Sequence, residues 1–67
     1  MMKNRIKVLR AERNLTQQEL ANLAGISRTT LALIEKEKAV PDGTTIAALV
    51  KALNVPAEQI FFDLSVV

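Results

Sequence analysis

The segment of residues 28–36 carries side chains suited to recognition through hydrogen bonds and charge. Read as a helix, it turns Leu31 and Ile34 to one side and Thr29 and Leu33 to the opposite side. This outward side is short and uncharged, with basic side chains only at its ends. Small or hydrogen-bonding groups on an outward face, with cations at the edges, are typical of a helix that enters the major groove of DNA.

The chain offers little for covalent catalysis. It contains no His and no Cys, which removes the usual general base, the thiolate nucleophile and the commonest transition-metal ligands. Its carboxylates are scattered among basic residues and form no Asp-x-Asp or Glu-x-x-Glu cluster for a hard metal ion. We therefore expect neither an enzyme, nor a metal site, nor a cofactor.

Charge is distributed unevenly along the chain. Residues 1–38 carry eight basic side chains against four acidic ones, whereas residues 39–67 carry one against three. The first part is therefore suited to an anionic partner. We see no targeting segment, and the longest apolar run, residues 46–50, is far shorter than the about 20 residues of a membrane span. We expect a cytoplasmic protein without a membrane partner.

The chain is 67 residues long and 49% hydrophobic, with two Phe as its only aromatic residues, which predicts one domain of packed helices. Thr16 and Glu19 form a capping box that opens a helix over residues 17–24. Gly25 supplies the left-handed residue that ends this helix, and Ser27 caps the next. A short turn containing Gly between two helices is the sequence form of a helix-turn-helix. The inward side chains of the first of these two helices are predicted to be Leu20, Leu23 and Ala24.

The remaining elements follow from the same kinds of signal. Three more helices are expected, over residues 5–13, from Asp42 or Thr44 to about Leu53, and over residues 57–61. Asn4 is the expected cap of the first of them. Residues 62–66 alternate apolar and polar side chains, which predicts a short strand in the C-terminal tail.

Three short motifs follow one another in a specific order. Leu-Thr-Gln-x-Glu-Leu-Ala occupies residues 15–21, Gly-Ile-Ser occupies 25–27, and Glu-x-x-Lys occupies 35–38. Each motif is weak alone, but in this spacing residues 4–61 resemble the Cro/repressor-type (XRE-like) helix-turn-helix family of transcriptional regulators. The resemblance implies an all-α, lambda-repressor-like fold of five helices, with residues 28–36 as the recognition helix.

The resemblance also implies roles for individual residues. Positions that face bases in the family are matched by Ser27, Arg28, Thr29 and Leu33. Positions that contact phosphate, or grip the backbone beyond the recognition helix, are matched by Gln17, Gln18, Thr30, Lys36 and Lys38. Arg28 would read guanine through its O6 and N7 atoms. Thr30 is also consistent with packing, and Leu33 with an exposed apolar residue that contacts nothing. Arg10 and Glu35 match a structural ion pair between the first helix and the end of the third.

One position departs from the family pattern. The family often has Gly at the end of the recognition helix, in a Glu-x-Gly-Lys pattern, and here Glu37 stands at that position. A left-handed backbone at Glu37 would be strained. A carboxylate there would also repel nearby phosphates, so the path of the loop and the role of Lys38 depend on how the chain accommodates this residue.

The sequence predicts a single helix-turn-helix domain over residues 1–67, with a core of about 4–61 and a tail, 62–67, that serves dimerisation. The expected dimer surface consists of Ile60, Phe62, Leu64 and Val66. We expect a homodimer that binds a palindromic double-stranded DNA operator, with half-sites about 34 Å apart, and represses transcription without a small-molecule effector. The alternative is a protein-binding adaptor or antitoxin-type module that uses the same fold. The sequence does not separate phage repressor, restriction-modification controller and antitoxin.

Overall fold

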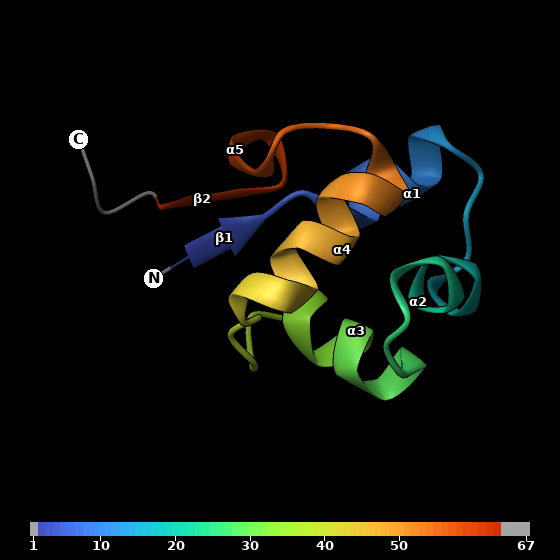
Figure 1. The fold of residues 1–67 in the computed structure, drawn as a ribbon, viewed down its shortest axis with the longest axis horizontal. Coiled ribbons are helices and arrows are strands. Elements are labelled where there is room, and N and C mark those ends of the chain that lie inside the picture. Colours follow the sequence, from blue (N-terminus) through green and yellow to red (C-terminus); the bar gives the residue numbers. More distant parts are fainter. Residues whose placement is uncertain (1, 64–67) are drawn as a thin grey trace.

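The protein is described here by a computed structural model that covers residues 2–63 (Figure 1). Within this range the chain forms five helices and two short strands. In chain order they are β1 (Met2–Asn4), α1 (Ile6–Glu12), α2 (Gln17–Ala24), α3 (Arg28–Glu35), α4 (Gly43–Leu53), α5 (Ala57–Ile60) and β2 (Phe61–Asp63). The five helices that the sequence predicts are therefore present. α2 has the predicted limits, and the limits of the other four agree within a residue or two.

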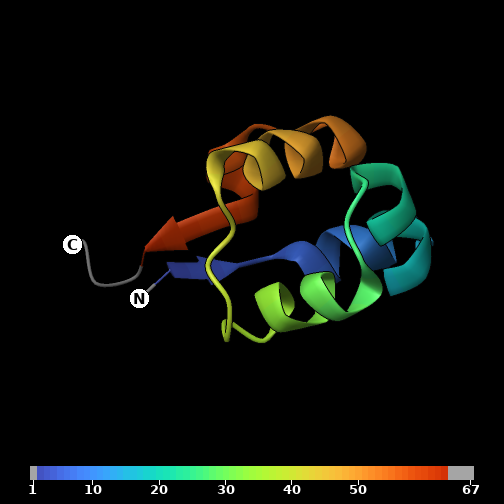
Figure 2. The same ribbon diagram turned by 60° about the horizontal axis from the view of Figure 1, so that its bottom comes forward.

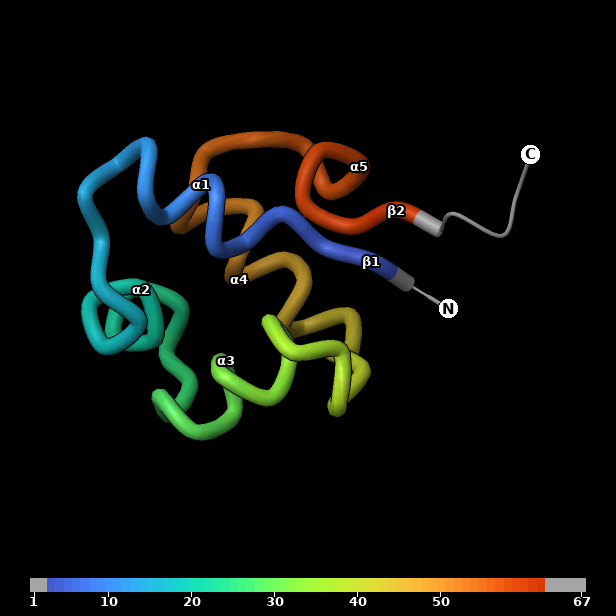
Figure 3. Tube along the Cα trace, turned by 180° about the vertical axis from the view of Figure 1, so that it is seen from behind, coloured from blue at the N-terminus to red at the C-terminus, as the bar shows by residue number. Residues whose placement is uncertain are grey.

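The helices surround one core, and the sheet lies at one end of the molecule. α2 packs against both α3 and α4, and it lies at the end opposite the two strands (Figures 1 and 3). Figure 2 shows α4 along one side of the molecule and α3 along the other, with the strands extending away from the helices. This arrangement leaves one long face of α3 outside the core.

The core is built from aliphatic side chains that come from every helix. Burying each such side chain stabilises the fold by about 1.5–3 kcal/mol relative to leaving it exposed. The largest fully buried side chains are Ile6, Leu20, Leu31, Leu49, Leu53 and Ile60. α3 contributes Leu31 and Ile34, as its periodicity predicts.

Local capping signals set the helix limits. The Thr16 hydroxyl accepts a hydrogen bond from the Glu19 backbone N–H at 3.0 Å, and Glu19 accepts one from the Thr16 N–H at 2.9 Å. Gly25 ends α2 with φ +71°, a conformation that side chains with a Cβ rarely adopt. Ser27 caps α3 and Asp42 caps α4, each accepting a hydrogen bond from a backbone N–H three residues on.

Two details of the helix predictions need correction. Asn4 lies in β1, one residue before the N-cap Arg5, which makes no side-chain cap; the Asn4 Oδ1 still accepts a hydrogen bond from the Ile6 N–H at 3.1 Å, so it caps that amide from outside the helix. Leu23 is 61% exposed, and Ala21 is buried in its place. At about 100° per residue, the buried face of α2 is centred between Leu20, Ala21 and Ala24, which turns Leu23 away from the core.

The tail strand is present but has a partner that the sequence pattern did not reveal. β2 pairs antiparallel with β1, with Lys3 opposite Phe62. A three-residue strand is too short for a period-2 pattern to identify it, which explains why β1 was not predicted. Ile60 is fully buried, so its assignment to a dimer surface is wrong; it packs inward as part of the α5 turn. Leu64 and Val66 lie outside the described residues.

Candidate nucleic-acid interface

The turn between α2 and α3 fixes how α3 sits on the core. The backbone N–H of Ile26 donates to the Ala21 carbonyl at 3.0 Å, which closes the end of α2. The Ile26 side chain is half-buried and packs against the core. Leu31 and Ile34 are buried as well, so α3 turns these side chains to the core and its opposite face to solvent.

The residues that the sequence assigns to base contacts lie together on this exposed face. Ser27, Arg28 and Thr29 are exposed at the start of α3, and Leu33 is 40% exposed one turn further on. Among the described residues, Arg28 and Thr29 make no side-chain hydrogen bond. Their donors are therefore available to an external acceptor.

Ser27 and Thr30 are already engaged with each other. The Ser27 hydroxyl accepts a hydrogen bond from the Thr30 N–H at 3.0 Å and donates to the Thr30 hydroxyl at 2.8 Å. The bond to the Thr30 hydroxyl therefore occupies the only side-chain donor of Ser27. Thr30 accepts from Ser27 and keeps its own O–H, so it is the better placed of the two to donate to a phosphate.

The residues assigned to phosphate contacts flank α3 on two sides. Gln17 is half-buried at the start of α2, where backbone N–H groups and the helix dipole favour an anion. Its amide donates to Glu35 at 3.3 Å, and the Gln18 amide donates to Asn22 on the same helix at 2.9 Å. The other two residues assigned to phosphate, Lys36 and Lys38, are positively charged and lie exposed just beyond α3.

Arg10 and Glu35 form the expected ion pair between α1 and the last residue of α3. The Arg10 Nε lies 2.8 Å from Glu35 Oε2, and Arg10 Nη2 lies 3.1 Å from Oε1. Arg10 also donates from Nη1 to the Leu15 carbonyl at 3.0 Å. The pair therefore links α1 to the end of α3, and Arg10 also holds the turn that precedes α2.

A polar hollow of about 300 Å³ opens beside this pair. It is lined by Lys7, Arg10, Gln17, Glu35 and Lys36. Lys7 matches no motif and is not among the site residues that the sequence predicts. The packing of α1 against α2 and α3 brings its charge to the hollow. With three cations to one carboxylate, the hollow is suited to a phosphate group.

Glu37 adopts the left-handed conformation that the family gives to glycine. Its φ is +63°, and the backbone closes α3 through the Lys38 N–H to the Leu33 carbonyl at 2.9 Å. Its carboxylate lies 3.1 Å from the Lys3 Nζ, in an ion pair that reaches β1. The loop therefore keeps the path of a glycine-ended helix, and Lys3 partly neutralises the added negative charge.

This geometry agrees with comparisons to known proteins. The family described as Helix-turn-helix matches residues 6–60, and the chain belongs to that family, which comprises DNA-binding transcriptional regulators and is not an enzyme family. An HTH-type transcriptional regulator of Methanocaldococcus jannaschii is 43% identical over 60 residues, which cover 90% of this chain and 91% of that protein.

Two further relatives carry more specific names. The immunity repressor protein of Bacillus phage phi105 is 43% identical over 56 residues, which are 84% of this chain but 39% of that repressor. The crystal structure of the restriction-modification controller protein C.AhdI from Aeromonas hydrophila is similar with a TM-score of 0.76 and 26% identity, covering 81% of this chain and 82% of that one. Within residues 2–63, no helix is both long and apolar enough to span a membrane.

Proposed function

We propose that residues 1–67 act in the cytoplasm as a sequence-specific repressor that binds a palindromic double-stranded DNA operator, with α3 in the major groove. The observation that carries this proposal is the exposed face of α3, where Arg28 and Thr29 have donors without partners in the described chain. A guanidinium reads guanine through two hydrogen bonds, and a good bidentate contact is worth about 1–3 kcal/mol of discrimination. Leu33, one turn on and 40% exposed, would contact the methyl group of a thymine.

Phosphate contacts on both sides of α3 would orient it on the duplex. Gln17 lies at the start of α2, and Lys36 and Lys38 follow the end of α3. Such contacts supply affinity and register but little sequence information. Gln18 on α2 and Thr30 on α3 are both exposed and would add donors, and Lys7 would add a charge at the polar hollow.

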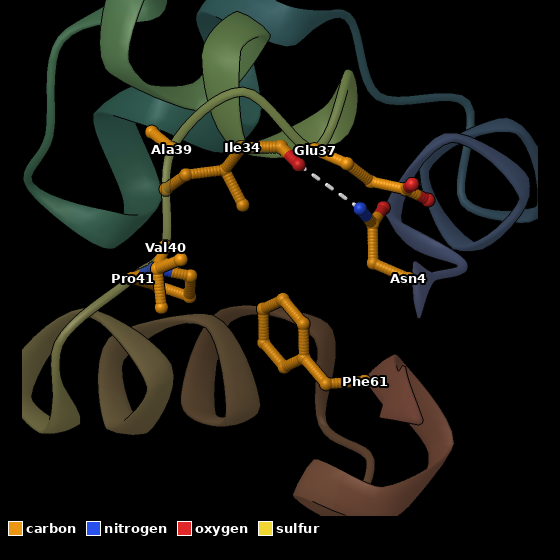
Figure 4. A pocket seen from close by; sticks show the side chains of 7 residues that line it. All are labelled: Asn4, Ile34, Glu37, Ala39, Val40, Pro41 and Phe61. Atoms are coloured by element: carbon orange, nitrogen blue, oxygen red, sulfur yellow. Dashed lines mark hydrogen bonds between the residues drawn. The ribbon is translucent and has the colours of Figure 1, made fainter. Parts of the chain in front are cut away.

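We propose that two copies bind together through the tail, residues 62–67, because one module of this size contacts few bases. Phe62 lies in β2 and is half-buried within a single chain. Next to the sheet is an apolar hollow of about 150 Å³, and Val40 at its edge is 85% exposed. Figure 4 shows the Phe61 ring and the Val40–Pro41 segment facing each other across it. A dimer formed by Phe62, Leu64 and Val66 would cover the side of β2 to which Phe62 points; the hollow lies on the other side, where Phe61 points, because successive side chains of a strand alternate between its faces.

The test begins with selection from a random duplex library and titration of the selected site over a salt series. The variant Arg28→Ala should lose preference at a defined base pair in each half-site. Lys36→Ala should weaken binding to all duplexes and reduce the salt slope by about one for each subunit, which is about two for the dimer. Lys51→Ala, an exposed lysine on α4, is the matched control and should change neither.

The outcomes separate the competing functions. A palindromic site that loses its base preference in Arg28→Ala supports the proposal, and its half-site spacing reports the dimer. A steep salt slope without any enriched sequence would mean that the protein binds only phosphates. No binding at low salt would overturn the DNA-binding proposal and favour a protein-binding adaptor. None of these steps requires a small-molecule effector.

A further inference from the structure

Asn4 joins three parts of the chain through its side chain. Its Nδ2 donates to the Ile34 carbonyl at 3.0 Å and to the Glu35 carbonyl at 3.4 Å, both in the last turn of α3. Its Oδ1 accepts a hydrogen bond from the Ile6 N–H at 3.1 Å, at the start of α1. Figure 4 shows the Asn4 amide reaching the Ile34 carbonyl at the edge of the apolar hollow.

The backbone of Asn4 belongs to the sheet at the same time. Asn4 pairs with Phe61 in the β1–β2 register, and the next N–H, that of Arg5, donates to the Ile60 carbonyl at 2.8 Å. The tail strand, the start of α1 and the end of α3 therefore meet at one residue. An amide side chain satisfies this position because it both donates and accepts, which neither a carboxylate nor an ammonium group does.

α3 needs such an external bond because it is short. An eight-residue helix is not stable by itself, so its position depends on tertiary contacts. The Arg10–Glu35 pair holds its end through side chains. Asn4 instead holds the backbone carbonyls of the last turn, which constrains the direction of the helix axis.

We infer that Asn4 is a positioning residue for α3: it fixes the recognition helix to the sheet and to α1 without contacting DNA. This inference rests on the proposed function, because it concerns how α3 is presented to an operator. In a dimer formed through the tail, the same residue would set the relation between the two copies of α3 and hence their fit to two half-sites.

Three variants test this role. Asn4→Ala removes both functions of the side chain. Asn4→Asp keeps the acceptor for the Ile6 N–H and removes the donor to α3. Val50→Ala, in the half-buried part of α4, lowers stability without a change at the end of α3 and serves as the matched control.

The first measurement is amide hydrogen exchange in the protein without DNA. The Lys38 N–H, bonded to the Leu33 carbonyl, reports the end of α3, and the Ile26 N–H, bonded to the Ala21 carbonyl, reports the end of α2. Asn4→Ala and Asn4→Asp should each speed exchange at Lys38 by about tenfold relative to Ile26. Val50→Ala should shift the two amides together.

The second measurement is affinity for the selected operator and for a duplex without it. Both Asn4 variants should lose about tenfold in operator affinity and keep their affinity for the other duplex. An Asn4→Asp protein that matches the wild type in exchange and binding would overturn the inference, as would a loss no greater than that of Val50→Ala. If no operator exists, the proposed function fails, and the exchange result alone decides whether Asn4 positions α3.

Discussion

Arg10 and Glu35 join α1 to the last residue of α3 through two parallel hydrogen bonds, of 2.8 Å and 3.1 Å. Their side chains are 14% and 7% exposed, so the pair is largely removed from water. Gln17 adds a third contact to Glu35 at 3.3 Å. One carboxylate therefore ties together the first helix and both helices of the helix-turn-helix.

Breaking this pair from one side should destabilise the protein strongly. Arg10→Ala or Glu35→Ala leaves a charge with little solvent and without its ionic partner, which costs about 3–5 kcal/mol for a buried pair. The double variant Arg10→Met/Glu35→Leu should recover most of that loss because no charge is left behind. Urea unfolding of the two single variants and the double variant measures this. Single variants that lose under about 1 kcal/mol would mean that the pair behaves as an exposed one.

Replacing Glu37 by Gly should stabilise the protein. The residue has φ +63°, where a side chain with a Cβ costs about 1–2 kcal/mol. Glu37→Gly also removes the ion pair with Lys3, a partly exposed contact worth about 0–1 kcal/mol. We expect a net gain of about 0.5–1 kcal/mol in the free energy of unfolding. Glu37→Gln is the control, since it removes the charge and keeps the strain; a Gly variant no more stable than this one would contradict the prediction.

The charge of Asp42 should make the stability of the protein depend on pH in the acidic range. The Thr45 backbone N–H, which donates to Oδ1 at 2.8 Å, holds the pKa of this carboxyl below its usual range, and a hydrogen bond from the Thr45 side chain adds to this. Because the pKa of Asp42 is lower in the folded state, its ionised carboxyl stabilises the fold at any pH above the unfolded-state pKa. This stabilisation is lost as the pH falls through the folded-state pKa.

Comparison with Asp42→Asn isolates this contribution, because the amide still caps α4 but does not titrate. The stability difference between wild type and variant should be constant near neutral pH and should change below about pH 4. Thermal unfolding of both proteins at a series of pH values measures it. A difference that stays constant down to about pH 2 would show that the Asp42 charge contributes nothing.

A chain that ends at Asp63 should be monomeric at micromolar concentrations where the full chain is a dimer. The truncation keeps β2 and its pairing with β1, so the fold should survive, but it removes Leu64 and Val66 from the proposed interface. Sedimentation equilibrium measures the association of both forms, and circular dichroism checks that the shorter one is folded. A folded, truncated chain that remains dimeric would move the interface elsewhere.

Much of this fold follows from local rules that act within a few residues. The Thr16–Glu19 capping box, Gly25 and Ser27 set the limits of α2 and the start of α3, and each works through contacts no more than five positions apart. The α3 periodicity separates Leu31 and Ile34 from the exposed recognition face for the same reason. Such features can be predicted from the sequence because the interacting groups are close to each other along the chain.

The tertiary structure decided what depends on groups far apart in the chain. Lys3 lies opposite Phe62 in the sheet, Asn4 bonds to Ile34, and Lys3 pairs with Glu37. The burial of Ile60 has the same origin, because it is set by which face of α5 meets the core. These contacts depend on how all the helices pack at once, since a hydrogen bond or ion pair forms only where packing brings its two groups within about 3 Å. No pattern within one short segment contains that information.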